Sequence, residues 1–155
     1  MDTLELQKSK AVDAYDNGTK KEKQFLERLY DKKTFQKDVM ERIKTFSDVL
    51  NELGIDAEKF EDLNKDSTSD EEAYRKLKYI CKALNEGWTP NWDDSREYKY
   101  LPWFKMGSSG FRYGVYDGWV TYSCVGSRLC FKSAELAKYA GNQFEDIYKN
   151  FMTTN

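Results

Sequence analysis

Few side chains in this sequence could carry out catalysis. The 155 residues contain no histidine, which excludes Ser-His-Asp and Cys-His nucleophile systems, imidazole zinc sites and the commonest general base near neutral pH. Asp93, Asp94 and Glu97 form a cluster of carboxylates beside tryptophans, and a glycosidase holds two carboxyl groups roughly 5 to 10 Å apart across a cleft. Neighbours in a turn have no such fixed separation. We therefore interpret the three as solvated turn residues and expect no enzymatic activity.

Metal binding is also not expected from the sequence. Residues 62–70 begin like a calcium loop, with oxygen ligands at alternate positions. Ser67 stands where such a loop needs glycine, and Ala73 stands where it needs a bidentate glutamate. The cysteines have neither metal-site nor disulfide spacing, and we interpret them as reduced core thiols: Cys81, Cys124 and Cys130. We predict no metal and no cofactor.

The stretch 88–104 is unusually aromatic, and all four tryptophans of the chain lie between positions 88 and 119. Trp and Tyr combine a large contact area with a polar handle, so such a stretch either packs over a sheet or presents a recognition surface. The candidate binding residues share aromatic or basic character: Trp88, Trp92, Trp103, Arg112, Tyr116, Trp119, Arg128 and Lys132.

Three kinds of binding protein fit these residues. We prefer a non-catalytic module that binds another protein, because the charge is nearly balanced and no catalytic set is present. A single-stranded nucleic-acid binder would stack bases on aromatic side chains and neutralise phosphates with basic ones, using Arg112, Tyr116, Trp119 and Arg128. A carbohydrate-binding or carbohydrate-cleaving protein would use Trp88, Trp92 and Asp93.

The composition favours one domain over residues 1–155, with residues 1–23 as a loose helix or tail. Apolar residues make up 39% and charged residues 34% of the chain, and the net charge of −2 gives no strong field toward nucleic acid or an anionic membrane. No apolar run approaches the roughly 18 residues of a membrane span, and the start of the chain lacks the pattern of a secretion signal. We expect a cytoplasmic protein that has no membrane partner.

The first half of the chain has the periodicity of helices. Apolar residues recur every three or four positions over 34–53, which predicts one helix that ends at Gly54. Asp56 would cap a short turn that carries Phe60 and Leu63. Ser69 and Glu72 match a capping box for a further helix, whose buried stripe would contain Ala73, Leu77, Ile80, Cys81 and Leu84.

The stretch 88–132 is typical of strands. Asp117-Gly118 is a strong hairpin signal, and Gly126-Ser127 is a second candidate turn. Both turns imply one register, in which one face carries Phe111, Tyr113, Val115, Val120, Tyr122, Cys124, Leu129 and Phe131. A strand over 98–106 would join as an edge strand because of Pro102. The opposite face would carry Arg112, Tyr116, Trp119, Arg128 and Lys132.

A final helix over 133–152 would begin at the cap residue Ser133 and cover the apolar face of this sheet. The predicted fold class is therefore α+β: N-terminal helices, then a three- to four-stranded antiparallel meander closed by a C-terminal helix. In such a sheet we expect Tyr122 and Leu129 to be nearly buried.

Three runs in the second half resemble a known group of proteins. Residues 83–92, 98–104 and 125–133 resemble small proteins of unknown function from gut bacteria of the Bacteroides type and their phages, over roughly residues 34–152. The resemblance implies no activity, cofactor or site residue. It implies a phage or prophage context, with a role in the cytoplasm of the bacterial host or in the virion.

Overall fold

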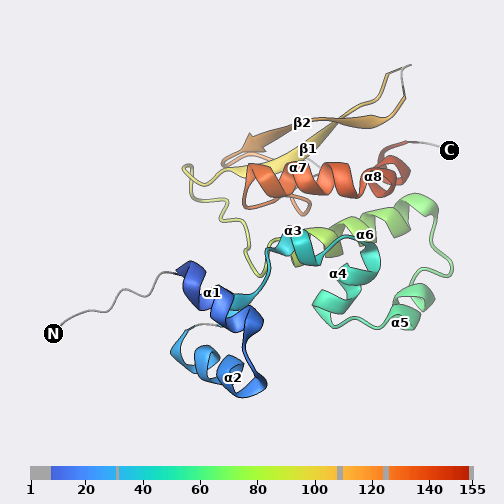
Figure 1. The fold of residues 1–155 in the computed structure, drawn as a ribbon. Helices are drawn as coiled ribbons and strands as arrows, with labels where there is room; N and C mark the ends of the chain where they lie inside the picture. The colour runs from blue at the N-terminus through green and yellow to red at the C-terminus, as the bar shows by residue number, and fades with distance from the viewer. Residues whose placement is uncertain (1–7, 31, 108–109, 124–125, 154–155) are drawn as a thin grey trace. The chain divides into compact units, whose positions relative to one another are not determined.

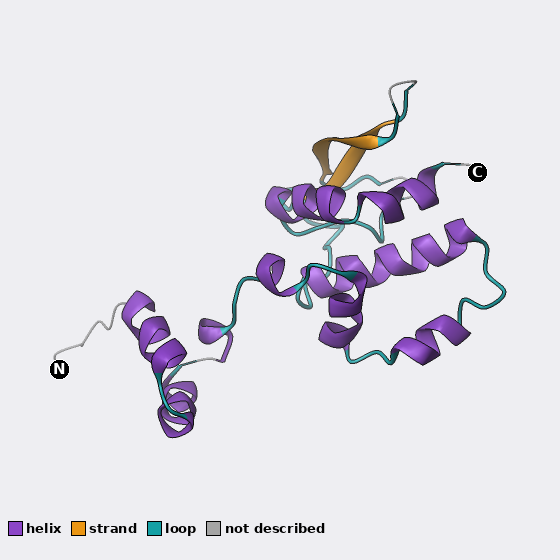
Figure 2. Ribbon diagram, turned by 45° about the vertical axis from the view of Figure 1, so that its right-hand side comes forward, coloured by secondary structure: helices purple, strands orange, loops and turns teal. Residues whose placement is uncertain are grey.

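A computed structural model describes residues 8–30, 32–107, 110–123 and 126–153. Within these ranges the chain forms eight α-helices, one 3-10 helix and a two-stranded antiparallel sheet, drawn in orange in Figure 2. The α+β class and the antiparallel pairing predicted from the sequence are confirmed. The chain divides into two compact units, Met1–Asp38 and Val39–Asn155, where the sequence predicts one domain.

The first unit consists of two helices and a short 3-10 turn: α1 Lys8–Asn17, α2 Lys20–Leu29 and η1 Lys32–Phe35. The Thr19 backbone N–H donates to Glu22 Oε2 at 2.6 Å, which caps the start of α2. The Tyr15 and Phe35 rings stack at 4.4 Å between centroids. From Lys8 onward, the stretch 1–23, for which the sequence predicts a loose helix or tail, contains α1 and the capped start of α2.

The second unit begins with four helices: α3 Val39–Arg42, α4 Phe46–Leu53, α5 Ala57–Asp62 and α6 Ser69–Leu84. The single helix predicted over 34–53 is wrong. Thr45 starts α4 afresh, because its backbone N–H donates to the Asp48 carboxylate at 2.7 Å in a capping box. The predicted end of this helix is confirmed, since Gly54 adopts the left-handed conformation with φ 65°.

The next two helices follow the sequence pattern more closely. As predicted, Asp56 caps α5 by accepting the Lys59 backbone N–H at 3.0 Å; of the two apolar residues placed there, Phe60 is buried and Leu63 is exposed. The capping box of α6 lies one residue earlier than predicted, at Thr68 and Glu71. The predicted stripe of α6 is buried: Ala73, Leu77, Ile80, Cys81 and Leu84.

The sheet pairs β1 (Lys99–Lys105) with β2 (Arg112–Trp119), so the predicted strand over 98–106 is confirmed. The prediction of a hairpin turn at Asp117-Gly118 is wrong, because both residues lie within β2 and Gly118 pairs with Tyr100. A Cβ at Gly118 would lie 3.1 Å from a ring carbon of Tyr98 and 3.4 Å from one of Tyr100. This glycine makes room for tyrosine rings and does not form a turn.

The remainder of the predicted meander does not form within the described residues. The Leu129 backbone N–H donates to Gly126 O at 2.8 Å, which makes a local turn, but Phe131 alone pairs back, through two hydrogen bonds with Tyr100. Leu129 is buried as predicted. Tyr122 is not, since its side chain is 79% exposed beyond the end of β2. Cys124, which the meander places on the apolar face, lies outside the described residues.

Two helices close the second unit: α7 Ala134–Gln143 and α8 Glu145–Met152. Ser133 caps α7 as predicted, but the single helix expected over 133–152 is interrupted at Phe144, whose φ and ψ are −119° and 30°. In Figure 1, α7 lies along the sheet, and α8 packs against α6. At Gly141 of α7 a Cβ would lie 2.5 Å from a ring carbon of Tyr113 and 2.9 Å from Pro102 Cβ, so glycine permits this close approach.

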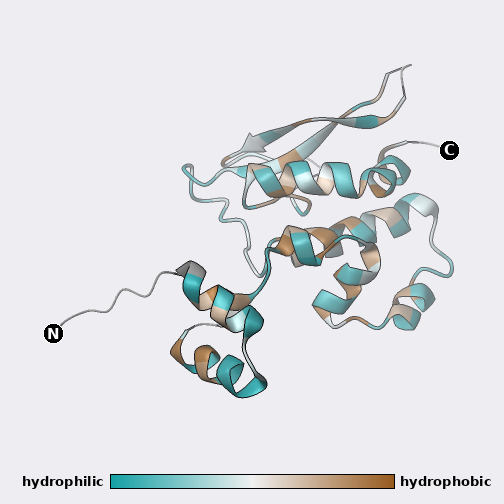
Figure 3. Cartoon of the chain, viewed as in Figure 1, coloured by the Kyte–Doolittle hydropathy of each residue, from teal (hydrophilic) through white to brown (hydrophobic). Residues whose placement is uncertain are grey.

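One hydrophobic core joins α3, α4, α6, α7, α8 and the sheet. Figure 3 marks the apolar residues of α6 and α7 in brown. The buried members of the core are Val39, Ile43, Val49, Leu77, Ile80, Cys81, Ala83, Leu84, Leu129, Phe131, Leu136, Ala137, Ala140, Phe144 and Tyr148. Among the described residues, no helix combines the length and the hydropathy that crossing a membrane requires.

Candidate functional site

Lys99, the first residue of β1, organises the aromatic loop 88–98. Its side chain is fully buried. Its Nζ donates to the backbone oxygen of Asn91, to that of Glu97 at 2.7 Å and to that of Asp94 at 3.3 Å. The same nitrogen lies 3.0 Å from Glu97 Oε1. A buried ammonium group needs such partners, and this loop supplies them by wrapping around the lysine.

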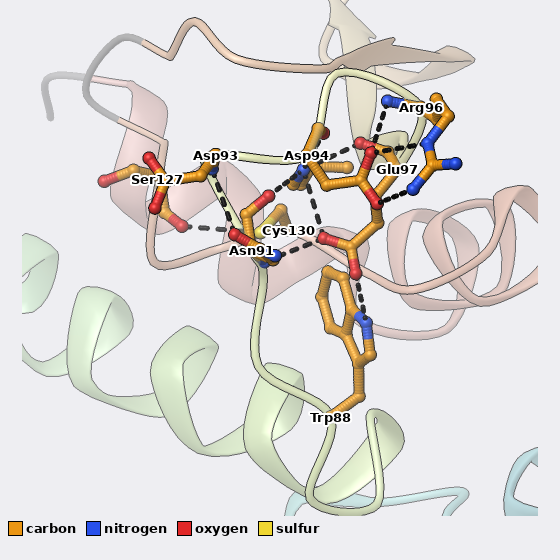
Figure 4. Close-up of polar contacts among 9 residues, drawn as sticks. Trp88, Asn91, Asp93, Asp94, Arg96, Glu97, Ser127 and Cys130 are labelled. Atoms are coloured by element: carbon orange, nitrogen blue, oxygen red, sulfur yellow. Dashed lines mark hydrogen bonds and ion pairs between the residues drawn. The ribbon is translucent and has the colours of Figure 1, made fainter.

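Both tryptophans of this loop are held by the same network. Trp88 Nε1 donates to Glu97 Oε2 at 3.2 Å, and Figure 4 shows the indole nitrogen directed at the carboxylate. The Trp92 ring centre lies 5.4 Å from Lys99 Nζ, within the range of a cation–π contact. The Asn91 backbone N–H, followed by Lys99, lowers the pKa of Glu97. The loop therefore presents two indoles in fixed positions.

Two of the three clustered carboxylates of this loop, those of Asp94 and Glu97, are engaged by neighbouring residues. The Arg96 guanidinium and backbone N–H donate to Asp94 at 3.1 and 2.9 Å, and the guanidinium is the main cause that lowers the pKa of Asp94 (Figure 4). The Asp93 backbone N–H donates to Asn91 Oδ1 at 3.0 Å. A carboxyl group that acts as a general acid needs a raised pKa. The pKa values of Asp94 and Glu97 are lowered instead, so neither group is suited to that role.

A groove of about 600 Å³ lies alongside β1 and α8. We call it the apolar groove; it is lined by Leu101, Pro102, Trp103, Phe104, Met106, Trp119, Tyr122, Ser123, Gly126, Leu129, Tyr148, Phe151 and Met152. None of these lining residues is charged. The Phe104 and Tyr148 rings pack against each other at 4.7 Å between centroids, which gives the groove a firm aromatic wall.

The exposed apolar side chains of the second unit gather around this groove. Trp103 is 49% exposed and Trp119 is 36% exposed. Except for Leu63 and Tyr98, the large apolar side chains that are exposed in the described part of this unit belong to the sheet, its flanks or the end of α8: Trp103, Met106, Val115, Tyr116, Trp119, Tyr122 and Met152. Five of these side chains line the groove itself: Trp103, Met106, Trp119, Tyr122 and Met152. An exposed apolar area of this kind is typical of an interaction site.

The aromatic and basic sheet face predicted from the sequence does not form. Tyr116 and Trp119 lie three positions apart on one strand, so their side chains point to opposite faces. Tyr116 packs edge-on against Tyr100, whereas Trp119 lines the apolar groove. Arg128 and Lys132 lie outside both strands. The prediction failed because it depended on the Asp117-Gly118 hairpin, which would have placed Tyr116 opposite Trp119.

The eight candidate residues are distributed over several environments. Trp103 and Trp119 line the apolar groove, while Trp88, Trp92 and Arg128 line a separate pocket beside α6. Arg112 is exposed at the start of β2. Lys132 forms an ion pair with Glu86 at 3.1 Å. Sequence reasoning missed Lys99, although a lysine between two tyrosines at the start of an apolar strand was an available signal.

The described cysteines are free thiols in the core. Cys81 and Cys130 are both buried. Burial raises the pKa of Cys130 to about 11 and that of Cys81 well above its usual value. Because the thiolate is the nucleophilic form, neither thiol is activated near neutral pH.

Together these features define a small α+β protein with an uncharged apolar groove and an aromatic loop closed around a buried lysine. No protein-family model matches the chain, and comparison with curated proteins and with solved structures gives no significant match. The geometry of the chain's own residues is therefore the basis on which a function can be assigned.

Proposed function

We propose that this protein is a non-catalytic module that binds a segment of another protein in the apolar groove. The observation that supports this function is the gathering of exposed Trp, Tyr and Met side chains around one uncharged groove. Trp and Tyr are the residues most enriched at the centres of protein interfaces.

The lining of the groove defines the chemistry of the partner segment. With no charged residue in the lining, the segment presents a large uncharged side chain as its anchor, since a buried unpaired charge is costly. Met106 and Met152 are exposed, flexible side chains that can adapt to the shape of that anchor. The volume of about 600 Å³ lies within the usual range of binding pockets, about 300 to 1,000 Å³.

A protein segment fits this surface better than a small apolar molecule does. The exposed apolar surface continues outside the groove onto β2 at Val115, which is 57% exposed and pairs with the groove residue Trp103. A small molecule held in the groove would leave the Val115 side chain in water. A longer segment can fill the groove with its anchor and cover β2 with its flanks.

The electrostatics of the described residues supports binding over catalysis. The pKa values of both cysteine thiols are raised, and those of Asp94 and Glu97 are lowered. These directions leave the thiols protonated and the carboxylates ionised near neutral pH, which is opposite to what a thiol nucleophile or a carboxylic general acid requires.

The two alternatives considered from the sequence have less support. Single-stranded nucleic-acid binding on the sheet relied on a face that β2 does not form. Carbohydrate binding relied on Trp88, Trp92 and Asp93, yet Asp93 does not line the pocket that contains both tryptophans.

We place this binding function in a phage or prophage context. The basis is the resemblance of residues 83–92, 98–104 and 125–133 to small proteins of Bacteroides-type gut bacteria and their phages. In that context the module acts in the cytoplasm of the bacterial host or in the virion, and its partner is a protein of the phage or of the host.

A peptide-display selection against the immobilised full chain tests the function. We expect enriched peptides with a shared aromatic or aliphatic anchor, whose affinity falls at least about tenfold for Trp103→Ala and for Trp119→Ala, as is usual for interface tryptophans. Leu63→Ala removes an exposed apolar side chain that does not line the groove, and it serves as the control without effect. Peptides that bind all three variants equally well would contradict the proposal.

A further inference from the structure

We propose that a second site, here called the basic pocket, binds a nucleoside phosphate. The basic pocket has a volume of about 460 Å³ and is lined by Lys78, Cys81, Lys82, Asn85, Trp88, Thr89, Pro90, Trp92, Ser127, Arg128 and Cys130. It shares no lining residue with the apolar groove, so this inference is independent of the protein-binding function.

The charge of the basic pocket selects an anion. Lys78, Lys82 and Arg128 line it, and no carboxylate does, although the whole chain carries more acidic than basic residues. Lys78 and Lys82 are four positions apart on α6 and thus lie on one face of the helix. Arg128 approaches from the turn after Gly126. Lys82 and Arg128 are exposed, and ammonium and guanidinium groups are the usual recognition set for phosphate, whereas Lys78 Nζ lies 4.9 Å from the centre of the Tyr74 ring.

Asn85 fixes the backbone segments that carry these basic side chains relative to each other. This residue is buried at the end of α6. Its Nδ2 donates to Cys130 O at 2.8 Å, and its Oδ1 accepts the Lys132 backbone N–H at 3.0 Å. The two hydrogen bonds fasten the helix that carries Lys78 and Lys82 to the segment that follows Arg128. The pocket is therefore formed before a ligand arrives.

The tryptophans of the pocket select a planar ring. Trp88 is held by its hydrogen bond to Glu97 and Trp92 by the Lys99 ammonium group, so neither indole has to be ordered on binding. Both side chains are half-buried and keep part of their surface accessible. A nucleobase can stack on an indole while its phosphate reaches the basic side chains. Such a ligand comes from two sources, a free nucleotide or the end of a single-stranded nucleic acid.

Titrations of the ¹⁵N-labelled full chain, followed through the tryptophan indole N–H signals, test this site. The probes are the four common nucleoside monophosphates, the matching nucleosides, inorganic phosphate and a short single-stranded oligonucleotide. We expect saturable shifts of the Trp88 and Trp92 signals with at least one monophosphate, and binding at least about tenfold weaker for its nucleoside and for phosphate alone. Saturation by the oligonucleotide but not by monophosphates identifies a strand end as the source.

Matched variants separate pocket recognition from general charge attraction. The double variant Lys82→Gln, Arg128→Gln should weaken binding at least about tenfold, through loss of charge-assisted hydrogen bonds. Lys138→Gln, which neutralises an exposed lysine on α7 outside the pocket, should leave it unchanged. The proposal is overturned if no nucleotide or oligonucleotide saturates the Trp88 and Trp92 signals, if the double variant binds as tightly as the parent chain, or if an acidic peptide shifts these signals with equal affinity.

Discussion

Lys99 and Glu97 form an ion pair of unequal burial: Nζ and Oε1 are 3.0 Å apart, the lysine side chain is fully buried, and the glutamate is 29% exposed. The lysine belongs to the first strand and the glutamate to the aromatic loop that precedes it. The pair therefore joins the sheet to the loop that positions Trp88 and Trp92. We expect the stability of this loop to depend on the Lys99 ammonium group.

Replacing Lys99 by methionine should destabilise the protein by about 3 kcal/mol. The substitution keeps most of the buried stem but leaves the carbonyls of Asn91 and Glu97 and the Glu97 carboxylate without their shared donor. Partial access of Glu97 to water keeps the cost near the lower end of the range for broken buried pairs. Urea unfolding measures the change. Lys105→Met, at an exposed position of the same strand, is the control and should change stability by less than about 0.5 kcal/mol.

Glu97 should make stability depend on pH in the acid range. Hydrogen bonding from Asn91 N–H, followed by Lys99, lowers its pKa below the ordinary 4.5 in the folded chain. A carboxylate with a lowered folded pKa contributes stability that is fully present above 4.5 and is lost as the pH falls through the folded value. Urea midpoints across this range should fall less steeply for Glu97→Gln, and the variant should be less stable at neutral pH. Identical pH profiles for the two chains would contradict this role.

Leu129 and Tyr122 should respond very differently to truncation. Leu129 is buried in the core, so Leu129→Ala should cost about 2 to 5 kcal/mol through lost transfer energy and a residual cavity. Tyr122→Ala removes an exposed ring and should change stability by less than about 0.5 kcal/mol. Equal losses, measured by urea unfolding, would show that Tyr122 packs within a sheet as the hairpin pattern predicted.

The buried hydroxyl of Tyr148 should be dispensable. Among the described residues it finds no hydrogen-bond partner, and burial raises its pKa well above the usual value. Tyr148→Phe keeps the ring that packs on Phe104 and removes an unsatisfied polar atom. We expect stability unchanged or raised by up to about 1 kcal/mol in urea unfolding. A clear loss of stability would mean that the hydroxyl has a partner.

The helices could be predicted from the sequence because their signals are local. The residues that end or cap helices at Gly54, Asp56 and Ser133 act there as expected. Two long helices were expected where the chain makes breaks, at Thr45 and at Phe144. Apolar periodicity continues across a break when both pieces face the same core, so periodicity alone cannot locate it.

The sheet and the candidate sites depended on contacts that no local pattern contains. Asp117-Gly118 has the composition of a turn, but Gly118 lies in a strand because the rings of Tyr98 and Tyr100 occupy the space beside it. The sequence grouped the tryptophans as candidate binding residues, whereas in the structure Trp103 and Trp119 line the apolar groove and Trp88 and Trp92 line the basic pocket. Lys99 was missed because a lysine is normally exposed, and its partners are backbone oxygens.

The central claim, that the apolar groove is the protein-binding surface, is tested most directly by the four indole N–H signals of the ¹⁵N-labelled chain. Trp103 and Trp119 line the groove, whereas Trp88 and Trp92 line the basic pocket. On titration with a peptide obtained by display selection, we predict that the Trp103 and Trp119 signals shift to saturation together while those of Trp88 and Trp92 stay in place. Saturating shifts confined to Trp88 and Trp92, or no shift of the groove tryptophans by a peptide that binds, would contradict the claim.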